Sequence, residues 1–484
     1  SPVKQPSEQA SPAKTTPTST PVKQPSELAS PAQAVTPSPV KEAADEPEEF
    51  VIVQKGDVPA ADSAEVQDAL PKEPPAPVPA PSVVEQQPQV CPPAAPQPCA
   101  NASNDVQQPV VQQSEAPQPC PTVTNNSHND VERDALLHRQ FCNNPHLQGS
   151  VPEAAKRFSL VSYNILADCH ATRYAGEYPW ASKEQLSQEV RHSRLLQEIR
   201  YLDPDVLCLQ EVGTQYYYGT LQPALKTLGY EGAFIKRNGE EYDEGEATFC
   251  RTSRFQILQS RGLVLSNVAG TVDLKASGIE QQACIQAAID SPGVAMVTQI
   301  KNIATGSVVT VANIHVMFDM FERPDLQCIQ VACAIRQLVS TAGGGDKPHV
   351  ICGDFNSWPG SPIYQLTQEG YLNDQSMSVL QAINAVTLPD GNKTSLVNMW
   401  WKGFQHTSMT LKSTYYTVFG QEPLSSRFPH DGVARNVDFI WYSSGSLQLL
   451  GALKSAPEEH IKAGIPNKVY PSDHVSLKAQ LSFF

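Results

Sequence analysis

The first 150 residues of this 484-residue sequence contain no tyrosine and no tryptophan, and phenylalanine occurs there only at Phe50 and Phe141. The same segment holds 27 of the 42 prolines and carries 18 acidic against 8 basic side chains. Such a segment cannot bury enough apolar surface to offset the entropy lost on ordering. We therefore predict that residues 1–150 form a disordered acidic arm. Residues 157–484 are predicted to form a folded domain that does not need the arm.

The arm has low sequence complexity. The heptapeptide PVKQPSE occurs at residues 2–8 and again at 21–27, but neither copy has a hydrophobic face on which a second repeat could stack, which excludes a solenoid. Its one apolar island is EEFVIVQKGD at residues 48–57. This island is either a chance apolar cluster in the arm or a segment that binds a protein partner by adding a strand to the partner's sheet.

Long apolar runs and paired cysteine motifs are also missing. No run approaches the roughly 18 apolar residues of a membrane-spanning helix, so no membrane insertion is predicted. The eleven cysteines are odd in number and form no C-x-x-C pair, and Cys208, Cys328 and Cys352 lie inside apolar runs. This usage favours reduced core thiols over a disulfide framework, and hence a cytoplasmic or nuclear location.

From Phe158 onward, apolar runs typical of strands alternate with segments of helical periodicity. The spacing predicts one helix over residues 183–202, stopped by Pro204, and another over residues 324–339 that begins with a proline. Buried strands are predicted over residues 205–212 and 307–318. The pattern indicates an α/β fold with one sizeable core.

Each predicted strand ends in polar residues that a core would not select. One polar residue at a strand end is usually a cap, but six strand ends share this feature. If the ends converge, several carboxylates share one pocket, and their repulsion requires a divalent cation. An oxygen-rich donor set favours Mg²⁺ or Mn²⁺ over zinc, and such a site suits hydrolysis of a phosphate ester. The residues concerned are Asn164, Gln210, Glu211, Asn313, His315, Asp354, Asn356, Asp438, Asp473 and His474.

Six motifs occur in a fixed order in this part of the chain: SYNIL, LQEV, ANIH, GDFNS, VDFI and SDH. Together they resemble the endonuclease/exonuclease/phosphatase superfamily, in the branch of the carbon-catabolite-repressor deadenylases and nocturnin. Within that branch the sequence looks most like the Angel proteins, and next like the 2′,5′-phosphodiesterase. The resemblance covers residues 157–484 and implies a four-layer α/β/β/α sandwich with two mixed sheets.

The resemblance also implies catalytic roles. Asp354 would take a proton from the attacking water, and Asn356 would orient that water and bind the phosphate. His474, oriented by Asp438, would donate to the scissile phosphate. His315 would contact the phosphate or a nearby sugar.

Metal and substrate contacts are implied in the same way. Glu211 would be the principal Mg²⁺ ligand, with support from Asn164 and Asp473, and Mn²⁺ is the alternative ion. Asn313 would contact the phosphate or sugar, and Trp358 either stacks on a base or packs against the domain.

Three features separate the chain from parts of that branch. Most relatives have Cys where this chain has Glu246, a change that adds negative charge near a phosphate site. No leucine-rich repeats precede the domain, which argues against a core deadenylase subunit. The cap-binding-factor partner of one Angel protein is not expected here, because Gln222 follows the nearest Y-x-x-x-x-L match, which begins at Tyr216.

The function predicted is a Mg²⁺-dependent phosphoesterase or ribonuclease acting on single-stranded RNA 3′ ends, either as a deadenylase-like 3′–5′ exoribonuclease or as a 2′,3′-cyclic phosphatase. One alternative is a 2′,5′-oligoadenylate phosphodiesterase, and another is an RNA-regulatory scaffold with weak activity. A phosphoinositide phosphatase is disfavoured by the residues around GDFN.

Residues 151–484 carry 27 basic and 32 acidic side chains, which favours short RNA ends over long duplexes as substrates. The oligomeric state is left open.

Overall fold

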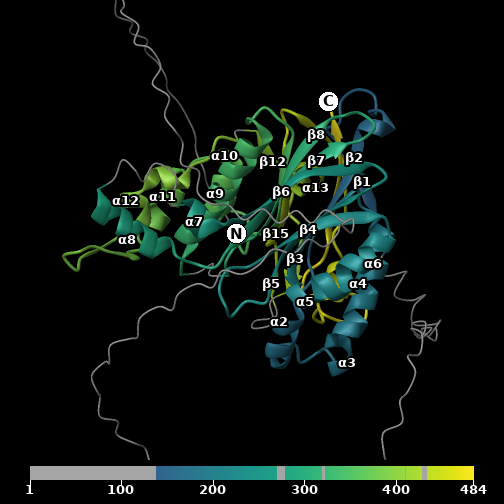
Figure 1. Ribbon diagram of the computed structural model, residues 1–484, viewed down its shortest axis with the longest axis horizontal. Coiled ribbons are helices and arrows are strands. Elements are labelled where there is room, and N and C mark those ends of the chain that lie inside the picture. The colour runs from purple at the N-terminus through teal and green to yellow at the C-terminus, as the bar shows by residue number, and fades with distance from the viewer. Residues whose placement is uncertain (1–137, 270–277, 319–321, 409, 428–432) are drawn as a thin grey trace, which may run out of the picture. The chain divides into compact units, whose positions relative to one another are not determined.

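The computed structural model describes residues 138–269, 278–318, 322–408, 410–427 and 433–484 (Figure 1). Most of the predicted arm, including the candidate binding stretch at residues 48–57, lies outside the described residues. Within the described part, every helix is too short or too polar to cross a membrane.

Two mixed β-sheets form the centre of the fold, and each contains one parallel pair, β2 with β3 and β8 with β9. In strand order the first sheet consists of β1 (Phe141–Asn143), β16 (Leu447–Leu453), β17 (Leu477–Phe483), β2 (Arg157–Asn164), β3 (Val206–Gly213), β5 (Glu244–Arg251) and β4 (Tyr230–Lys236). The second consists of β12 (Leu411–Ser413), β15 (Asp438–Ser443), β9 (His349–Asp354), β8 (Val308–His315), β7 (Val294–Asn302) and β6 (Phe255–Val264). Two short hairpins are β10 (Val386–Thr387) with β11 (Lys393–Thr394), and β13 (Ser426–Arg427) with β14 (Ala434–Arg435).

Helices cover the outer faces of both sheets. Those of the first half of the chain are α2 (Asp168–Arg173), α3 (Lys183–Leu186), α4 (Gln188–Leu202), α5 (Thr214–Tyr216), α6 (Gln222–Thr227), α7 (Leu265–Ala269) and α8 (Ile279–Ile289). Those of the second half are α9 (Pro324–Ala342), α10 (Pro362–Glu369), α11 (Asp374–Gln381), α12 (Leu396–Met399), α13 (Thr414–Phe419) and α14 (Glu458–Ile461). Single turns of other helix types are η1 (Ala154–Lys156), η2 (Ala175–Glu177), η3 (Tyr217–Leu221) and η5 (Trp401–Phe404).

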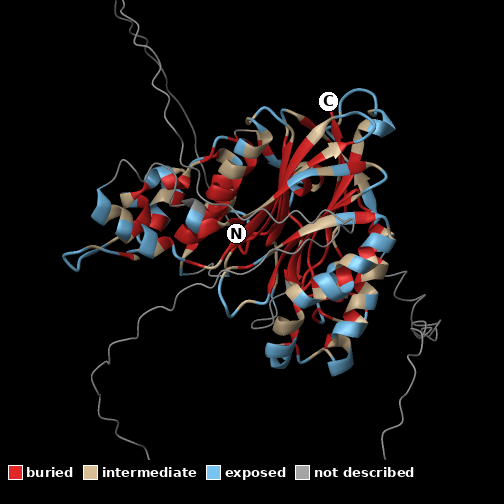
Figure 2. Cartoon of the chain, in the orientation of Figure 1, coloured by how far each residue is buried: buried red, intermediate tan, exposed pale blue. Residues whose placement is uncertain are grey.

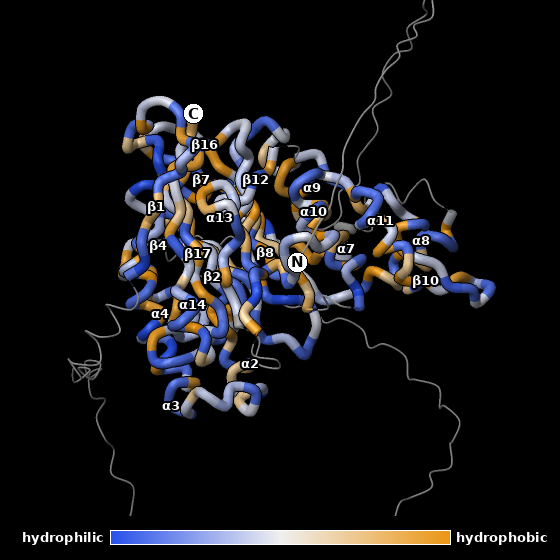
Figure 3. The backbone as a smooth tube through the Cα atoms, turned by 180° about the vertical axis from the view of Figure 1, so that it is seen from behind, coloured by the Kyte–Doolittle hydropathy of each residue, from blue (hydrophilic) through white to orange (hydrophobic). Residues whose placement is uncertain are grey.

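Three hydrophobic clusters separate four layers. One lies between the sheets and joins Leu160 and Val206 of the first sheet to Val311 and Val350 of the second. A second packs the outer face of the first sheet against α4 and α6, and a third packs the outer face of the second sheet against α8, α9 and α10. Buried and hydrophobic residues gather along the strands (Figures 2 and 3). The predicted α/β/β/α sandwich is confirmed.

The predicted helices form with small changes at their ends. The segment at 183–202 is divided into α3 and α4 because Ser187 has an extended backbone (ψ 139°). Asp203 then ends α4 in a left-handed conformation, one residue before Pro204. The helix that begins at Pro324 continues to Ala342, where Gly343 adopts a left-handed conformation that ends it.

The folded part begins earlier than residue 157, which differs from the predicted boundary. Residues 141–143, placed with the arm by composition, form β1 and pair with β16. Just before this strand, Arg139 is buried, and its guanidinium donates to the main-chain oxygen of Ser476 at 2.7 Å and to the Ser476 hydroxyl at 2.6 Å. The guanidinium also lies 3.6 Å from the fully buried carboxylate of Glu198. A polar interaction that composition cannot reveal therefore ties this segment to the domain.

Deleting residues 1–137 should leave the free energy of unfolding of the rest unchanged, whereas deleting residues 1–150 should lower it. The longer deletion leaves Glu198 without its cation, and breaking a buried ion pair from one side costs about 3–5 kcal/mol. Urea denaturation of both truncated chains measures the difference. Arg139→Met in the full chain should reproduce most of the loss, and Arg200→Met, on an exposed part of the same helix as Glu198, serves as the control. Equal stability of the two truncated chains would show that the segment contributes nothing.

Candidate active site

The inner faces of both sheets carry polar residues where the apolar strands end. On β2, Leu160 faces the core between the sheets, and Asn164 ends the strand on the same side. On β9, Cys352 faces that core, and Asp354 ends the strand on the same side. The amide nitrogen of Asn164 donates to Asp354 Oδ2 at 3.1 Å and to Glu211 Oε1 at 2.9 Å. One amide thus joins carboxylates of the two sheets.

Glu211 reaches this point because its strand is irregular. The pairing of β3 with β5 shifts between Leu209 and Val212, and Glu211 has a φ of 55°. This bulge turns the Glu211 side chain away from the outer face that Leu209 occupies. Glu211 Oε2 accepts a hydrogen bond from the backbone N–H of Ala167 at 3.0 Å.

His170, in α2, is a site residue that the sequence analysis missed. Its Nδ1 lies 2.9 Å from Glu211 Oε2. Burial alone would lower the pKa of His170, but Glu211 raises it to about 11. Burial alone would likewise raise the pKa of Glu211, yet His170 and the amide of Asn164 hold it well below its usual range. No strand-end motif contains His170, and its only sequence signal is its place in the loop and helix that follow SYNIL.

The turn after β9 sets the geometry of Asp354 and Asn356. Asn356 has a φ of 45°, its backbone N–H donates to Asp354 Oδ1 at 2.8 Å, and its amide donates to the main-chain oxygen of Val316 at 2.8 Å. Gly353 is required before them, because a Cβ there would lie 1.8 Å from the carbonyl oxygen of Ile314. The Asn356 amide nitrogen also lies 3.2 Å from His315 Nε2.

His474 and Asp438 form a pair directed at Asp354. His474 Nδ1 lies 2.8 Å from Asp438 Oδ2, and His474 Nε2 lies 3.6 Å from Asp354 Oδ2. Although burial opposes the charge, Asp438 and Asp354 raise the pKa of His474 well above its usual value. Burial raises the pKa of Asp354 to about 7, with a further contribution from Asp438. The site therefore holds one proton donor and one carboxylate poised to take up a proton.

Asp473 lies at the same site, with Oδ2 accepting a hydrogen bond from the Tyr178 hydroxyl at 3.0 Å. Burial raises the pKa of Asp473, and the charge of Glu211 raises it further. Several buried carboxylates that destabilise one another in this way are the donor set that a hard divalent cation neutralises. The residues present fit such an ion, with Glu211 and Asp473 as its carboxylate donors.

The two predicted substrate contacts Asn313 and Trp358 differ in burial. Asn313 is fully buried between the sheets, where its amide donates to the main-chain oxygens of Leu209 and Ala247 at 3.0 Å and accepts from Gln210 at 2.6 Å. Both amide hydrogens are thus used in joining the sheets, and this placement does not fit contact with a phosphate. Trp358, on the loop after Asn356, is 38% exposed, so its ring is partly open to solvent.

The family profile described as endonuclease/exonuclease/phosphatase matches residues 161–474, which contain all the site residues above. The chain belongs to the endonuclease/exonuclease/phosphatase family. Members of the family generally depend on a divalent metal, and this site holds one buried group of possible metal ligands, Asp354, Asp438 and His474.

Relatives in this family support the predicted branch. The 3′–5′-exoribonuclease subunit Ccr4 of the CCR4-Not complex from Coccidioides immitis is 26% identical over 67% of this chain and 47% of its own length. The Ccr4 subunit from Debaryomyces hansenii is 28% identical over 66% of this chain and 38% of its own. The chain therefore spans about half the length of these curated relatives. The crystal structure of ANGEL2, a 2′,3′-cyclic phosphatase, is 27% identical with a TM-score of 0.55, covering 67% of this chain and 95% of that one. These likenesses confirm the Ccr4-like, Angel-related branch that the six motifs indicate.

Proposed function

We propose that this member of the endonuclease/exonuclease/phosphatase family is a Mg²⁺-dependent phosphoesterase acting on the 3′ ends of single-stranded RNA. One observation carries the proposal: a charged His474 and a buried Asp354 face each other 3.6 Å apart, beside the carboxylate of Glu211. A proton donor and a proton acceptor side by side can serve one reaction, because one can hydrogen-bond a phosphoryl oxygen while the other takes a proton from water. Likeness to Ccr4 and ANGEL2, both named for RNA 3′-end or cyclic-phosphate chemistry, supports the substrate class.

The residues divide the reaction between them. Asp354, held by the backbone of Asn356, takes the proton of the attacking water. His474, held by Asp438, donates a hydrogen bond to a phosphoryl oxygen, and the Asn356 amide orients the phosphate by exchanging its contact with His315 for one with a phosphoryl oxygen. A bound divalent cation, held by Glu211 and Asp473 with Asn164 beside them, supplies positive charge to the phosphoryl oxygens.

Of the two reactions at a 3′ end, opening a 2′,3′-cyclic phosphate has the stronger support. The likeness to ANGEL2 includes the fold, with 27% identity and a TM-score of 0.55, whereas the likeness to Ccr4 is one of sequence, at 26% identity. The slightly acidic composition of residues 151–484 also suits a small terminal group better than a long polynucleotide.

The test offers the purified full chain three substrates with Mg²⁺: an RNA ending in a 2′,3′-cyclic phosphate, poly(A), and 2′,5′-oligoadenylate. We expect the cyclic end to be opened fastest and 2′,5′-oligoadenylate to be hydrolysed slowest. Preference for poly(A) would assign the chain to the exoribonucleases. No hydrolysis of any RNA, with or without Mn²⁺, would leave the scaffold role as the explanation.

The same proposal places the protein in the cytoplasm or nucleus. The eight cysteines in the described part of the chain are all free, and five of them are buried. Free buried thiols suit a reducing compartment. The stretch at residues 48–57 of the arm remains the candidate contact for protein partners.

A further inference from the structure

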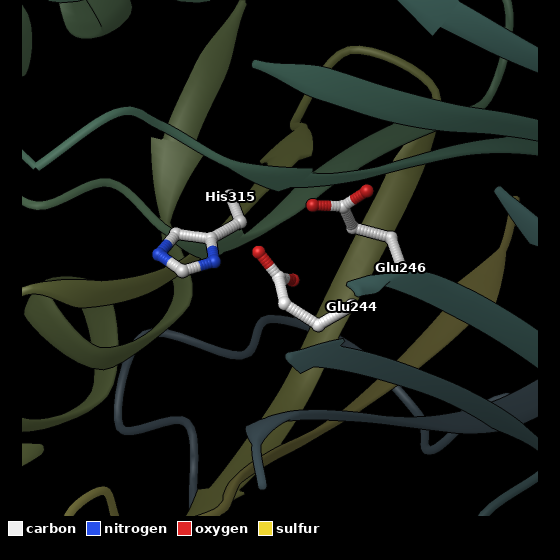
Figure 4. Close-up of side chains that lie close together, drawn as sticks. All are labelled: Glu244, Glu246 and His315. Atoms are coloured by element: carbon white, nitrogen blue, oxygen red, sulfur yellow. The ribbon is translucent and has the colours of Figure 1, made fainter. Parts of the chain in front are cut away.

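A second group of buried ligating side chains lies deeper between the sheets. Glu244 and Glu246 are two residues apart on β5, and both point to the inner face that Cys250 of the same strand also occupies. His315, at the end of β8, faces them from the other sheet (Figure 4). One ligating atom from each of the three residues lies within 4.8 Å of the others.

Two of these side chains lack the partners that buried polar groups normally have. Glu246 is fully buried, and neither of its carboxylate oxygens accepts a hydrogen bond from another residue. His315 is 6% exposed, and its Nδ1 has no hydrogen-bond partner in the described part of the chain. Figure 4 shows a ring nitrogen of His315 facing the Glu244 carboxylate. Buried ligand atoms without hydrogen-bond partners lower the stability of the folded state. When several of them converge on one point, a bound ion at that point would offset this loss.

Among the described residues, Arg237 is the one cation within ion-pair distance of Glu244 and Glu246. Its guanidinium lies 2.7 Å from Glu244 and 3.9 Å from Glu246, too far from Glu246 for a hydrogen bond. When both carboxylates are ionised, one negative charge stays uncompensated in a buried space. Burial raises the pKa of Glu246 well above its usual range, which measures how strongly that charge is disfavoured when no further cation is present.

We propose that Glu244, Glu246 and His315 form a binding site for a divalent transition metal of the Mn²⁺ or Zn²⁺ class. Two carboxylates and one imidazole suit such an ion better than Mg²⁺, which prefers oxygen donors alone. Burial lowers the pKa of His315 well below its usual value, so the ring is neutral and can coordinate through Nδ1. The ion removes the uncompensated charge and leaves Arg237 paired with Glu244.

This site is separate from the one at Glu211 but adjoins it through one ring. His315 Nε2 faces the amide of Asn356 at 3.2 Å, while Nδ1 faces Glu244. An ion on Nδ1 places the proton of the neutral ring on Nε2, so ion binding must also change the contact between His315 and the Asn356 amide. The proposal concerns metal content and does not rest on the RNA chemistry proposed above.

The test measures Zn²⁺ and Mn²⁺ binding to the full chain by equilibrium dialysis with elemental analysis. We compare the wild type with Glu246→Gln, with Glu211→Gln and with Glu240→Gln, which changes an exposed carboxylate near the same strand. Glu246→Gln should remove one bound ion, or weaken its binding at least about 100-fold, because it removes a direct ligand. Glu240→Gln should bind as the wild type does, and Glu211→Gln should retain the ion held by Glu246.

Thermal unfolding gives a second, independent measure. Added Zn²⁺ or Mn²⁺ should raise the melting temperature of the wild type and of Glu211→Gln, but not that of the double variant Glu211→Gln with Glu246→Gln, which lacks ligands of both sites. The proposal is overturned if Glu246→Gln binds as many ions as the wild type with equal affinity. It is also overturned if the wild type binds no ion beyond the one at Glu211 and if Glu246→Gln is more stable than the wild type without metal. Glu244 and Glu246 would then share a proton instead of binding an ion. Hydrolysis of RNA is not needed for any of these outcomes.

Discussion

Replacing Asp354 with Asn should lower kcat by about 10²–10⁴-fold, the usual contribution of one positioned general base. Asparagine keeps the volume of the side chain, and its carbonyl oxygen can still accept the backbone hydrogen bond from Asn356. It cannot take a proton from water. Substrate binding should therefore stay close to that of the wild type, and steady-state kinetics with a short RNA separates kcat from KM.

The dependence on pH sharpens this test. Asp354 acts as a base only when it is deprotonated, and burial raises its pKa to about 7 in the metal-free chain. The wild-type rate should rise with pH up to about 7, or up to a lower pH when a bound cation stabilises the carboxylate. This rising limb should be missing in Asp354→Asn.

Asn356→Ala is the matched variant on the same turn. It removes an amide that contacts His315 and the oxygen of Val316, so it should weaken both binding and turnover. If Asp354→Asn leaves kcat unchanged, or unfolds the domain, Asp354 is a structural cap and the catalytic interpretation of GDFNS fails.

Replacing Glu211 with Gln should abolish Mg²⁺-dependent hydrolysis while the fold stays intact. The substitution keeps the shape of the side chain, and the amide oxygen can accept the hydrogen bond from Ala167. It removes the charge that would hold a cation at this point. Calorimetric titration with Mg²⁺ should show weakened binding, and activity should fall with it.

His170 provides an internal control on this variant. Because the charge of Glu211 is the main contribution that raises the pKa of His170 to about 11, Glu211→Gln should lower that pKa, which NMR titration of the ring can follow. Glu189→Gln, an exposed carboxylate on α4, should change neither metal binding nor the His170 titration. Mg²⁺-dependent activity that survives within tenfold in Glu211→Gln would exclude Glu211 as the principal ligand.

Local patterns in the sequence were sufficient for much of the fold and for the residues at the strand ends. Period-two alternation places Asp354 on the inner face and Phe355 on the outer face, because that alternation depends only on residues within one strand. Polar residues at the ends of β2, β3, β9 and β15 were likewise visible as interruptions of apolar runs.

What the sequence did not reveal depends on contacts between distant segments. His170 meets Glu211 across 41 positions, and Arg139 meets Ser476 across 337. Asn313 looks like a site residue by its neighbours in sequence, but the opposite sheet supplies carbonyl oxygens that take both of its amide hydrogens. Composition placed residues 138–150 with the arm because a three-residue edge strand contributes almost no apolar signal.

The left-handed backbone at Glu211 and Asn356 has a consequence for how this protein evolves. A residue with a side chain loses about 1–2 kcal/mol in that conformation, and glycine does not. Selection for stability alone would therefore favour glycine at both positions. The proposed site needs a carboxylate and an amide there, so folding and function compete at these two of the four described non-glycine residues with positive φ.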